Sequence, residues 1–108
     1  DSDLLFDVRS VANPHWVPEL RPKDGRDREV AAYVLNDPVG ASIEAAIAAF
    51  ASATLETYLS DGRGRLSIAI GCTGGQHRSV YLVERLRLRL AGKVAGLTHR
   101  HSSLTARS

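Results

Sequence analysis

Residues 70–79 read IGCTGGQHRS and place a thiol, two glycines, a histidine, an arginine and a hydroxyl between a strand-like and a helix-like stretch. The glycines allow a tight turn whose N–H groups can face an anion. The N-terminus of the following helix adds partial positive charge. The segment therefore predicts a phosphate- or carboxylate-binding loop, made of Thr73, Gly74, Gly75, Gln76, His77, Arg78 and Ser79.

Two side chains of this loop could reach an anion directly. The Arg78 guanidinium can bind two phosphate oxygens at once, and Ser79 can cap the helix or contact the ligand. The alternative is a tight strand-to-helix turn around a buried structural cysteine. A turn alone requires neither histidine nor arginine beside the glycines, so ligand binding is the favoured interpretation.

The same loop also matches C-x5-R-[ST], the signature of cysteine-dependent phosphatases, with Cys72 and Arg78 in the two key positions. In such enzymes the loop lowers the thiol pKa and the thiolate attacks phosphorus. A general acid is also needed, and the sequence places none of its candidates (Asp7, Asp24 and Asp27) beside the loop. A binding domain without a catalytic residue is the favoured hypothesis, and the phosphatase is the alternative. The P-loop pattern G-x4-G-K-[ST] is not matched.

A second constellation, NPHW, occupies residues 13–16. Pro14 should stiffen the loop and Trp16 should anchor it in the core, which would hold His15 in a fixed orientation. His15 is then either a solvent-facing histidine or a ligand contact. His15 and His77 lack a third ligand at regular spacing, so neither a metal site nor a cofactor is predicted.

The composition indicates one ordinary globular domain over residues 1–108, with 44% hydrophobic residues. No apolar run is judged long enough to cross a bilayer. A single cysteine favours a reducing, cytoplasmic setting. The net charge of +2 is modest for a dedicated nucleic-acid binder.

The predicted fold class is α/β, with a small, mostly parallel sheet flanked by helices. The predicted strands are Leu4–Arg9, Leu66–Ile70 and a last one around Val94–His99, and the predicted helices are Arg28–Leu35, Val39–Leu59 and Ser79–Ala91. Asp27 and Asp37 are the expected caps of the first two helices. If the first two strands are parallel neighbours, loops 12–26 and 71–78 share the sheet edge at which such folds bind ligands.

The predicted helix after the glycine loop carries Arg78, Arg85 and Arg89 on one stripe, with Val83, Leu86 and Leu90 on its apolar face. The stripe is either a solvated surface or an extension of the anion site along RNA phosphates.

Three stretches, FDVRSVANPHW, LRPKDGRDREVAAYV and IAIGCTGGQHRSVYLVERL, resemble the C-terminal domain of the RapZ family of RNase adapter and nucleotide-binding proteins. The resemblance covers about residues 4–90. It implies a relation to part of the phosphofructokinase fold, assembly into a homo-oligomer, and no established phosphatase activity. In the family a P-loop NTPase-like domain precedes this part, and the 108 residues contain no counterpart of it. A second alternative to the binding domain is therefore an oligomerisation scaffold for that absent NTPase domain.

The resemblance also implies ligands and partners: glucosamine-6-phosphate, small regulatory RNA, and an endoribonuclease to which one such RNA is presented. Family ligand positions fall on Asp7, His15, Thr73, Gly74, His77 and Arg78. Arg85, Arg89 and Arg100 are the expected RNA contacts. The chain ends in HRHSSLTARS rather than a lysine-rich tail, which makes RNA binding the weaker expectation.

Overall fold

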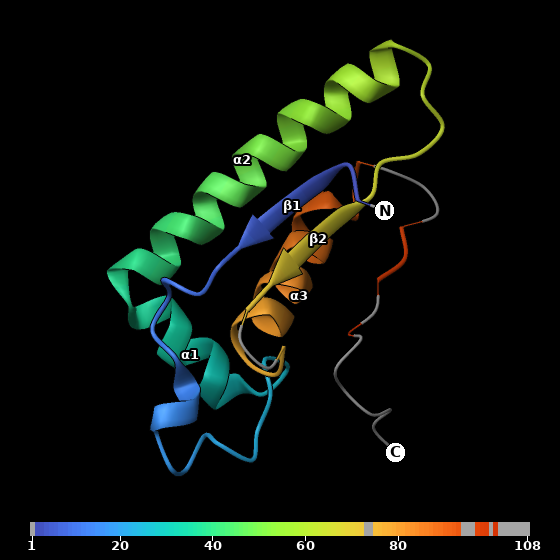
Figure 1. The fold of residues 1–108 in the computed structure, drawn as a ribbon. Helices are drawn as coiled ribbons and strands as arrows, with labels where there is room; N and C mark the ends of the chain where they lie inside the picture. The colour runs from blue at the N-terminus through green and yellow to red at the C-terminus, as the bar shows by residue number, and fades with distance from the viewer. Residues whose placement is uncertain (1, 73–74, 94–96, 100, 102–108) are drawn as a thin grey trace.

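The computed structural model describes residues 2–72, 75–93, 97–99 and 101. Its elements follow in the order β1 (Leu4–Asp7), a 3-10 turn η1 (Pro14–Trp16), α1 (Arg28–Asn36), α2 (Pro38–Ser60), β2 (Ile68–Gly71) and α3 (Arg78–Leu90). Figure 1 shows the two strand arrows pointing the same way, toward the end of the domain where α1 and the N-terminus of α3 lie.

The sheet consists of β1 and β2 in parallel, with Leu4 opposite Ile68 and Asp7 opposite Gly71. Helices α1 and α2 form the crossover between the strands, as parallel pairing requires. Helix α3 packs against β2 and α2. The prediction of an α/β domain with a small parallel sheet flanked by helices is confirmed.

The strands are shorter than predicted because local hydrogen bonds end them. The Asp7 carboxylate accepts the Arg9 N–H at 3.0 Å, which turns the chain out of β1 at Asp7 rather than at Arg9. The Ser67 N–H donates to the Asp3 carboxylate at 2.8 Å, so β2 begins at Ile68 rather than at Leu66. Of the last predicted strand, residues 94–96 lie outside the described part, and 97–99 do not form a strand.

The helix boundaries agree with prediction to about a residue. Both predicted caps, Asp27 and Asp37, are N-cap residues, but only Asp37 caps its helix through the side chain. Asp37 accepts the N–H groups of Val39 and Gly40, as expected of the N-cap of α2. Asp27 is the N-cap residue of α1, as expected, but its side chain accepts the Asp24 N–H at 2.8 Å and makes no cap hydrogen bond to the helix.

The core forms where α1, α2 and α3 meet β1 and the segment after it. Its buried side chains are those of Val8, Val11, Leu20, Val30, Val34, Ile47, Ala51, Leu55, Tyr81, Leu82, Leu86 and Leu90. Three apolar side chains of α1 and α2, those of Leu35, Phe50 and Leu59, are at least half exposed. Phe50 still contacts Phe6 edge-to-face, with 5.9 Å between ring centroids, which brings α2 against β1.

Helix α2 is long and apolar enough to cross a membrane by length and composition, so the sequence-based statement that no such run exists is wrong on that criterion. Its buried stripe packs into this domain and includes Gly40, Glu44, Ile47, Ala51 and Leu55. The core helix of a folded domain passes the same test, and these contacts account for α2 as one.

Gly25 fixes how closely loop 12–26 approaches α3. A β-carbon at this position would overlap the backbone nitrogen of Tyr81 and the backbone oxygen of His77. Both atoms belong to the first turn of the helix and cannot move aside as a flexible side chain can. The loop therefore lies against the helix backbone only because residue 25 has no side chain.

Replacing Gly25 with alanine should lower the free energy of unfolding by at least about 2 kcal/mol, the scale of overpacking in a dense core. The matched control is Gly64→Ala, because a β-carbon there meets nothing within 4 Å. Urea unfolding of the two variants measures the difference. Equal stabilities would show that the loop can withdraw from α3 without cost.

Candidate anion-binding site at the carboxyl end of the sheet

The parallel register brings the two chemically rich loops to one edge of the sheet. Asp7 and Gly71 are opposite each other at the ends of their strands, and the Val8 N–H donates to the Gly71 carbonyl at 2.9 Å. Cys72 therefore begins its loop beside the point where the chain leaves β1. The expectation that loops 12–26 and 71–78 share the carboxyl edge of the sheet is confirmed.

Gln76 and His77 fasten loop 12–26 to the start of α3. The Gln76 side-chain amide donates to the carbonyls of Arg21 and Lys23 at 2.7 and 2.6 Å, and the main-chain carbonyl of Gln76 accepts the Gly25 N–H at 3.0 Å. The buried His77 ring is bonded through Nε2 to the Leu20 carbonyl at 3.0 Å. Both side chains, predicted as ligand contacts, position the loop in this structure.

Arg78 is 3% exposed and its guanidinium is directed at the chain that follows β1. Nη1 donates to the carbonyls of Arg9 and Val11 at 2.8 and 3.1 Å. Nε is buried and has no hydrogen-bond partner among the described residues. The predicted contact of Arg78 with phosphate therefore stays a prediction, and Nη1 is not free to make it.

Cys72 and Ser79 are joined by two hydrogen bonds across the loop. The thiol donates to the Ser79 hydroxyl, and the Ser79 N–H donates to Sγ, each at 3.3 Å. Burial raises the pKa of the Cys72 thiol, but the hydrogen bonds with Ser79 and the Gly75 N–H outweigh it. The net pKa of Cys72 is lowered from its ordinary value of 9.0, so this loop stabilises negative charge.

Asp7 and Arg9 form an exposed ion pair at the same edge, with 2.8 Å between Nη2 and Oδ2. The hydrogen bond from Arg9 lowers the pKa of Asp7, which keeps the carboxylate ionised. Because both side chains are exposed, either can exchange its partner for a ligand.

His15 lies on the 3-10 turn η1, exposed, with its ring edge-to-face against Trp16. Trp16 is 75% exposed, so the prediction that it anchors the loop in the core is wrong. Pro14 is the buried residue of this turn, and the Arg21 side chain donates to the His15 carbonyl at 2.9 Å. The turn is thus positioned through Pro14 and its backbone.

Three predicted site residues, Thr73, Gly74 and Arg100, lie outside the described residues. Gly75 is described and has a φ of +63°, the left-handed conformation for which a glycine was predicted in this turn.

Of the predicted arginine stripe, Arg85 and Arg89 contact a buried acid that the sequence analysis missed. Arg78 does not share their surface, because it is buried against the chain after β1. Glu44 of α2 is 5% exposed and accepts hydrogen bonds from the Tyr81 hydroxyl at 2.7 Å, Arg89 at 3.0 Å and Arg85 at 3.2 Å. Burial raises the pKa of Glu44, but these bonds lower it more, below its ordinary value of 4.5. Arg85 and Arg89 therefore remain partly exposed, with one of their two charges balanced.

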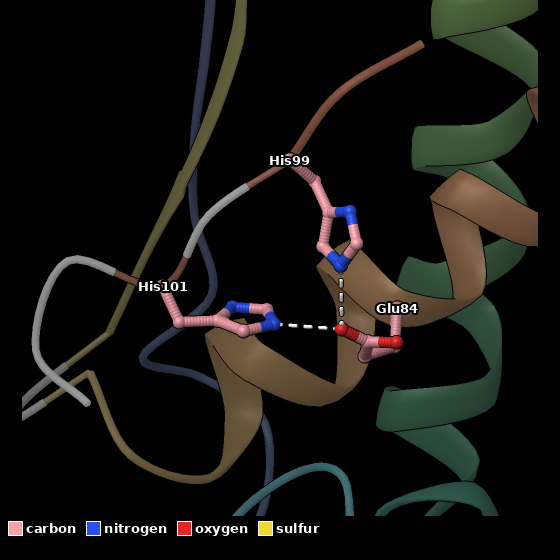
Figure 2. A group of neighbouring side chains, drawn as sticks. All are labelled: Glu84, His99 and His101. Carbon is pink, nitrogen blue, oxygen red and sulfur yellow. Dashed lines mark hydrogen bonds and ion pairs between the residues drawn. The ribbon is translucent and has the colours of Figure 1, made fainter. Parts of the chain in front are cut away.

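A second group missed by the sequence analysis comprises Glu84, His99 and His101 (Figure 2). The pattern H-x-H at 99–101 was the available signal. The histidine pair of this pattern lies far in sequence from Glu84, so spacing alone does not join the three residues.

Comparison with known proteins adds to this geometry. Residues 1–105 match the family model described as the RapZ C-terminal domain. Proteins named "Nucleotide-binding protein" are similar over almost the whole chain: one from Rhizorhabdus wittichii is 46% identical over 105 residues, one from Nitrosococcus oceani 43% over 105, and one from Leptothrix cholodnii 46% over 107.

These alignments cover 97%, 97% and 99% of this chain but only 34%, 37% and 33% of the relatives. The chain thus spans about a third of the length of the curated relatives it matches. It belongs to the RapZ C-terminal domain family, as the resemblance of its motifs indicated.

The loop's effect on Cys72 can be measured directly, because the sequence contains one cysteine. The rate of iodoacetamide alkylation should rise with pH to a midpoint near 9.0 for the urea-unfolded chain. The folded chain should show a lower midpoint. Ser79→Ala removes the hydroxyl bond and should raise the folded midpoint. Ser60→Ala, at the far end of α2, should leave it unchanged. A folded midpoint at or above that of the unfolded chain would contradict the electrostatic description of the loop.

Proposed function

We propose that this chain is a sensory or binding domain, rather than an enzyme, that takes an amino-sugar phosphate of the glucosamine-6-phosphate type. The phosphate would lie in the loop of Thr73, Gly74, Gly75, Gln76, His77, Arg78 and Ser79. Asp7 and His15 would close over the sugar. Homo-oligomer formation, a relation to part of the phosphofructokinase fold and a cytoplasmic location belong to the same proposal, and family membership supports them.

The observation that carries the proposal is the Cys72 environment. Backbone N–H groups of Gly75 and Ser79 act on Sγ at the N-terminus of α3, and the thiol pKa is lowered despite burial. Groups that stabilise a thiolate are suited to a phosphate oxygen at the same helix terminus. The parallel strands place this terminus at the sheet edge where ligands of α/β folds bind.

The structure modifies how the predicted residues would contribute. Because Gln76, His77 and Arg78 hold backbone carbonyls, we assign them mainly to positioning the loop. Phosphate contacts would then come chiefly from backbone N–H groups. Asp7 is exposed and ionised, and a carboxylate there suits the ammonium group that distinguishes glucosamine-6-phosphate from glucose-6-phosphate.

The alternative, a cysteine-dependent phosphatase, draws on the lowered pKa of Cys72. That chemistry also needs an arginine whose guanidinium faces the transferred phosphoryl group. Nη1 of Arg78 instead donates to Arg9 and Val11 carbonyls, and this favours binding over hydrolysis.

A small regulatory RNA is the second partner we propose, with presentation of that RNA to an endoribonuclease as the adapter role. Arg85, Arg89 and Arg100 would contact phosphates. Glu44 reduces the charge that the first two can offer, so one protomer should bind weakly. Several protomers of an oligomer acting on one RNA would supply the missing affinity.

Calorimetry should show that the domain binds glucosamine-6-phosphate more tightly than glucose-6-phosphate. It should also bind glucosamine-6-phosphate at least about tenfold more tightly than glucosamine, which is the scale of hydrogen bonds to a charged group. Asp7→Asn should reduce the preference for the amino sugar. Asp3→Asn, the same change at the opposite end of β1, should preserve it.

Equal affinities for glucosamine and its phosphate would contradict the site. The same samples should release no phosphate from an aryl phosphate. Turnover that disappears in Cys72→Ser would instead favour the phosphatase.

For RNA, Glu44→Gln is a sharper test than loss of both arginines, which would leave a buried carboxylate with fewer partners. The amide keeps an acceptor for Tyr81 while removing the charge that balances Arg85 and Arg89. RNA affinity should rise at low salt, and the slope of log affinity against log salt should steepen by roughly 0.7–0.9 per phosphate gained. Glu56→Gln, an exposed position on the same helix, is the matched control. No change in Glu44→Gln would make the stripe a solvated surface only.

A further inference from the structure

Three side chains converge on one point beside the middle of α3 (Figure 2). The Glu84 atom Oε2 lies 3.0 Å from Nε2 of His99 and 2.7 Å from Nε2 of His101. All three atoms lie within 4.8 Å of one another. Glu84 follows Arg78 by about 9 Å along the helix axis, at 1.5 Å per residue, so the cluster is separate from the loop at the helix N-terminus.

The atoms that converge are ones that bind metal ions, and not merely opposite charges. Two imidazole nitrogens and one carboxylate oxygen are the donors of a common class of transition-metal site. Figure 2 shows both rings directing Nε2 at the same carboxylate oxygen and the other ring nitrogen away from it. A metal ion at this point would be bound by both Nε2 atoms without their protons, and the other ring nitrogen of each imidazole would carry the proton.

The spacing suits an ion with little rearrangement. Ligands bound to Zn²⁺ at tetrahedral angles lie about 3.4 Å apart. The nitrogen–oxygen contacts of 3.0 and 2.7 Å would have to open by about 0.4 and 0.7 Å to reach that spacing. The two imidazole nitrogens, which lie within 4.8 Å of each other, would have to reach the same separation, and rotations of exposed His99 and of the Glu84 carboxylate can supply these changes.

The surroundings favour a defined site over a chance surface contact. The side chain of His101 is 10% exposed and that of Glu84 is 23% exposed, so water competes weakly for these atoms. The other Glu84 oxygen, Oε1, accepts a hydrogen bond from Arg87 at 3.4 Å, which helps to orient the carboxylate.

We propose that Glu84, His99 and His101 bind a divalent transition-metal ion of the Zn²⁺ type. Three protein ligands leave one position for water or a small anion. Imidazole donors select Zn²⁺, Co²⁺ or Ni²⁺ over Mg²⁺, which prefers oxygen. The ion would join the segment after α3 to the helix, because His99 and His101 come from that segment and Glu84 from the helix.

The test uses the 108-residue chain after treatment with a chelator and dialysis, in a Cys72→Ser background that removes the thiol as a competing ligand. Calorimetry should detect one Zn²⁺ per chain, and Co²⁺ should give the visible absorption of a low-coordinate site. His99→Ala and Glu84→Gln should each weaken Zn²⁺ binding about tenfold or more. His15→Ala removes an exposed histidine outside the cluster and should have no effect.

Zn²⁺ binding that is unchanged in both His99→Ala and Glu84→Gln would overturn the proposal, as would binding lost only in His15→Ala. Absence of Zn²⁺ binding to the parent at micromolar concentrations would overturn it too, as would competition by equal Mg²⁺. His99 is exposed, so its variant should stay folded even if a change at the more buried His101 does not. Imidazole NMR signals of His99 and His101 that shift with Zn²⁺ would provide support independent of affinity.

Discussion

The buried Arg78 guanidinium holds the chain leaving β1 against the first turn of α3. Its Nη1 bonds to two carbonyls beyond the strand end, so a charge deep in the domain is compensated by backbone dipoles. Removing this side chain would leave two buried acceptors unpaired and detach the loop edge from the helix. Because the chain leaving β1 and the glycine loop meet at this helix turn, their relative positions depend on this interaction.

Glu44 joins α2 to α3 by buried hydrogen bonds, as Arg78 joins the N-terminus of α3 to the chain after β1. A carboxylate at 5% exposure would be unfavourable alone, but three donors from α3 surround it and keep it ionised. The two helices are thereby held in one register by polar contacts within an otherwise apolar interface. The positive potential of this surface is lower as a result, because Glu44 balances one of the two charges of Arg85 and Arg89.

Much of this arrangement could be predicted from the sequence. The proline after Asp37 and the apolar spacing of 39–59 indicated α2, and the strand-like runs predicted a parallel pair whose carboxyl ends meet. The loop composition predicted an anion site at residues 73–79, because glycines beside Arg78 are unusual in a plain turn, and that site stays a prediction.

Other features could not be predicted, because they depend on contacts between distant segments. Nothing local shows that Gln76 and His77 bind carbonyls of residues 20–23, or that Glu44 lies beside Tyr81. Trp16 was expected inside because tryptophan is large and apolar, but Pro14 takes the buried position of that turn. The trio of Glu84, His99 and His101 likewise joins residues separated by 15 and 17 positions.

The side chains of residues 76–78 form hydrogen bonds with main-chain oxygens of residues 9–23. Every amino acid supplies such an oxygen, so the side chains of Arg9, Leu20, Arg21 and Lys23 are not required for these bonds. Mutation can therefore alter the chemistry displayed by the loop while its path is kept. A scaffold of this kind lets ligand preference drift during evolution without passing through misfolded intermediates.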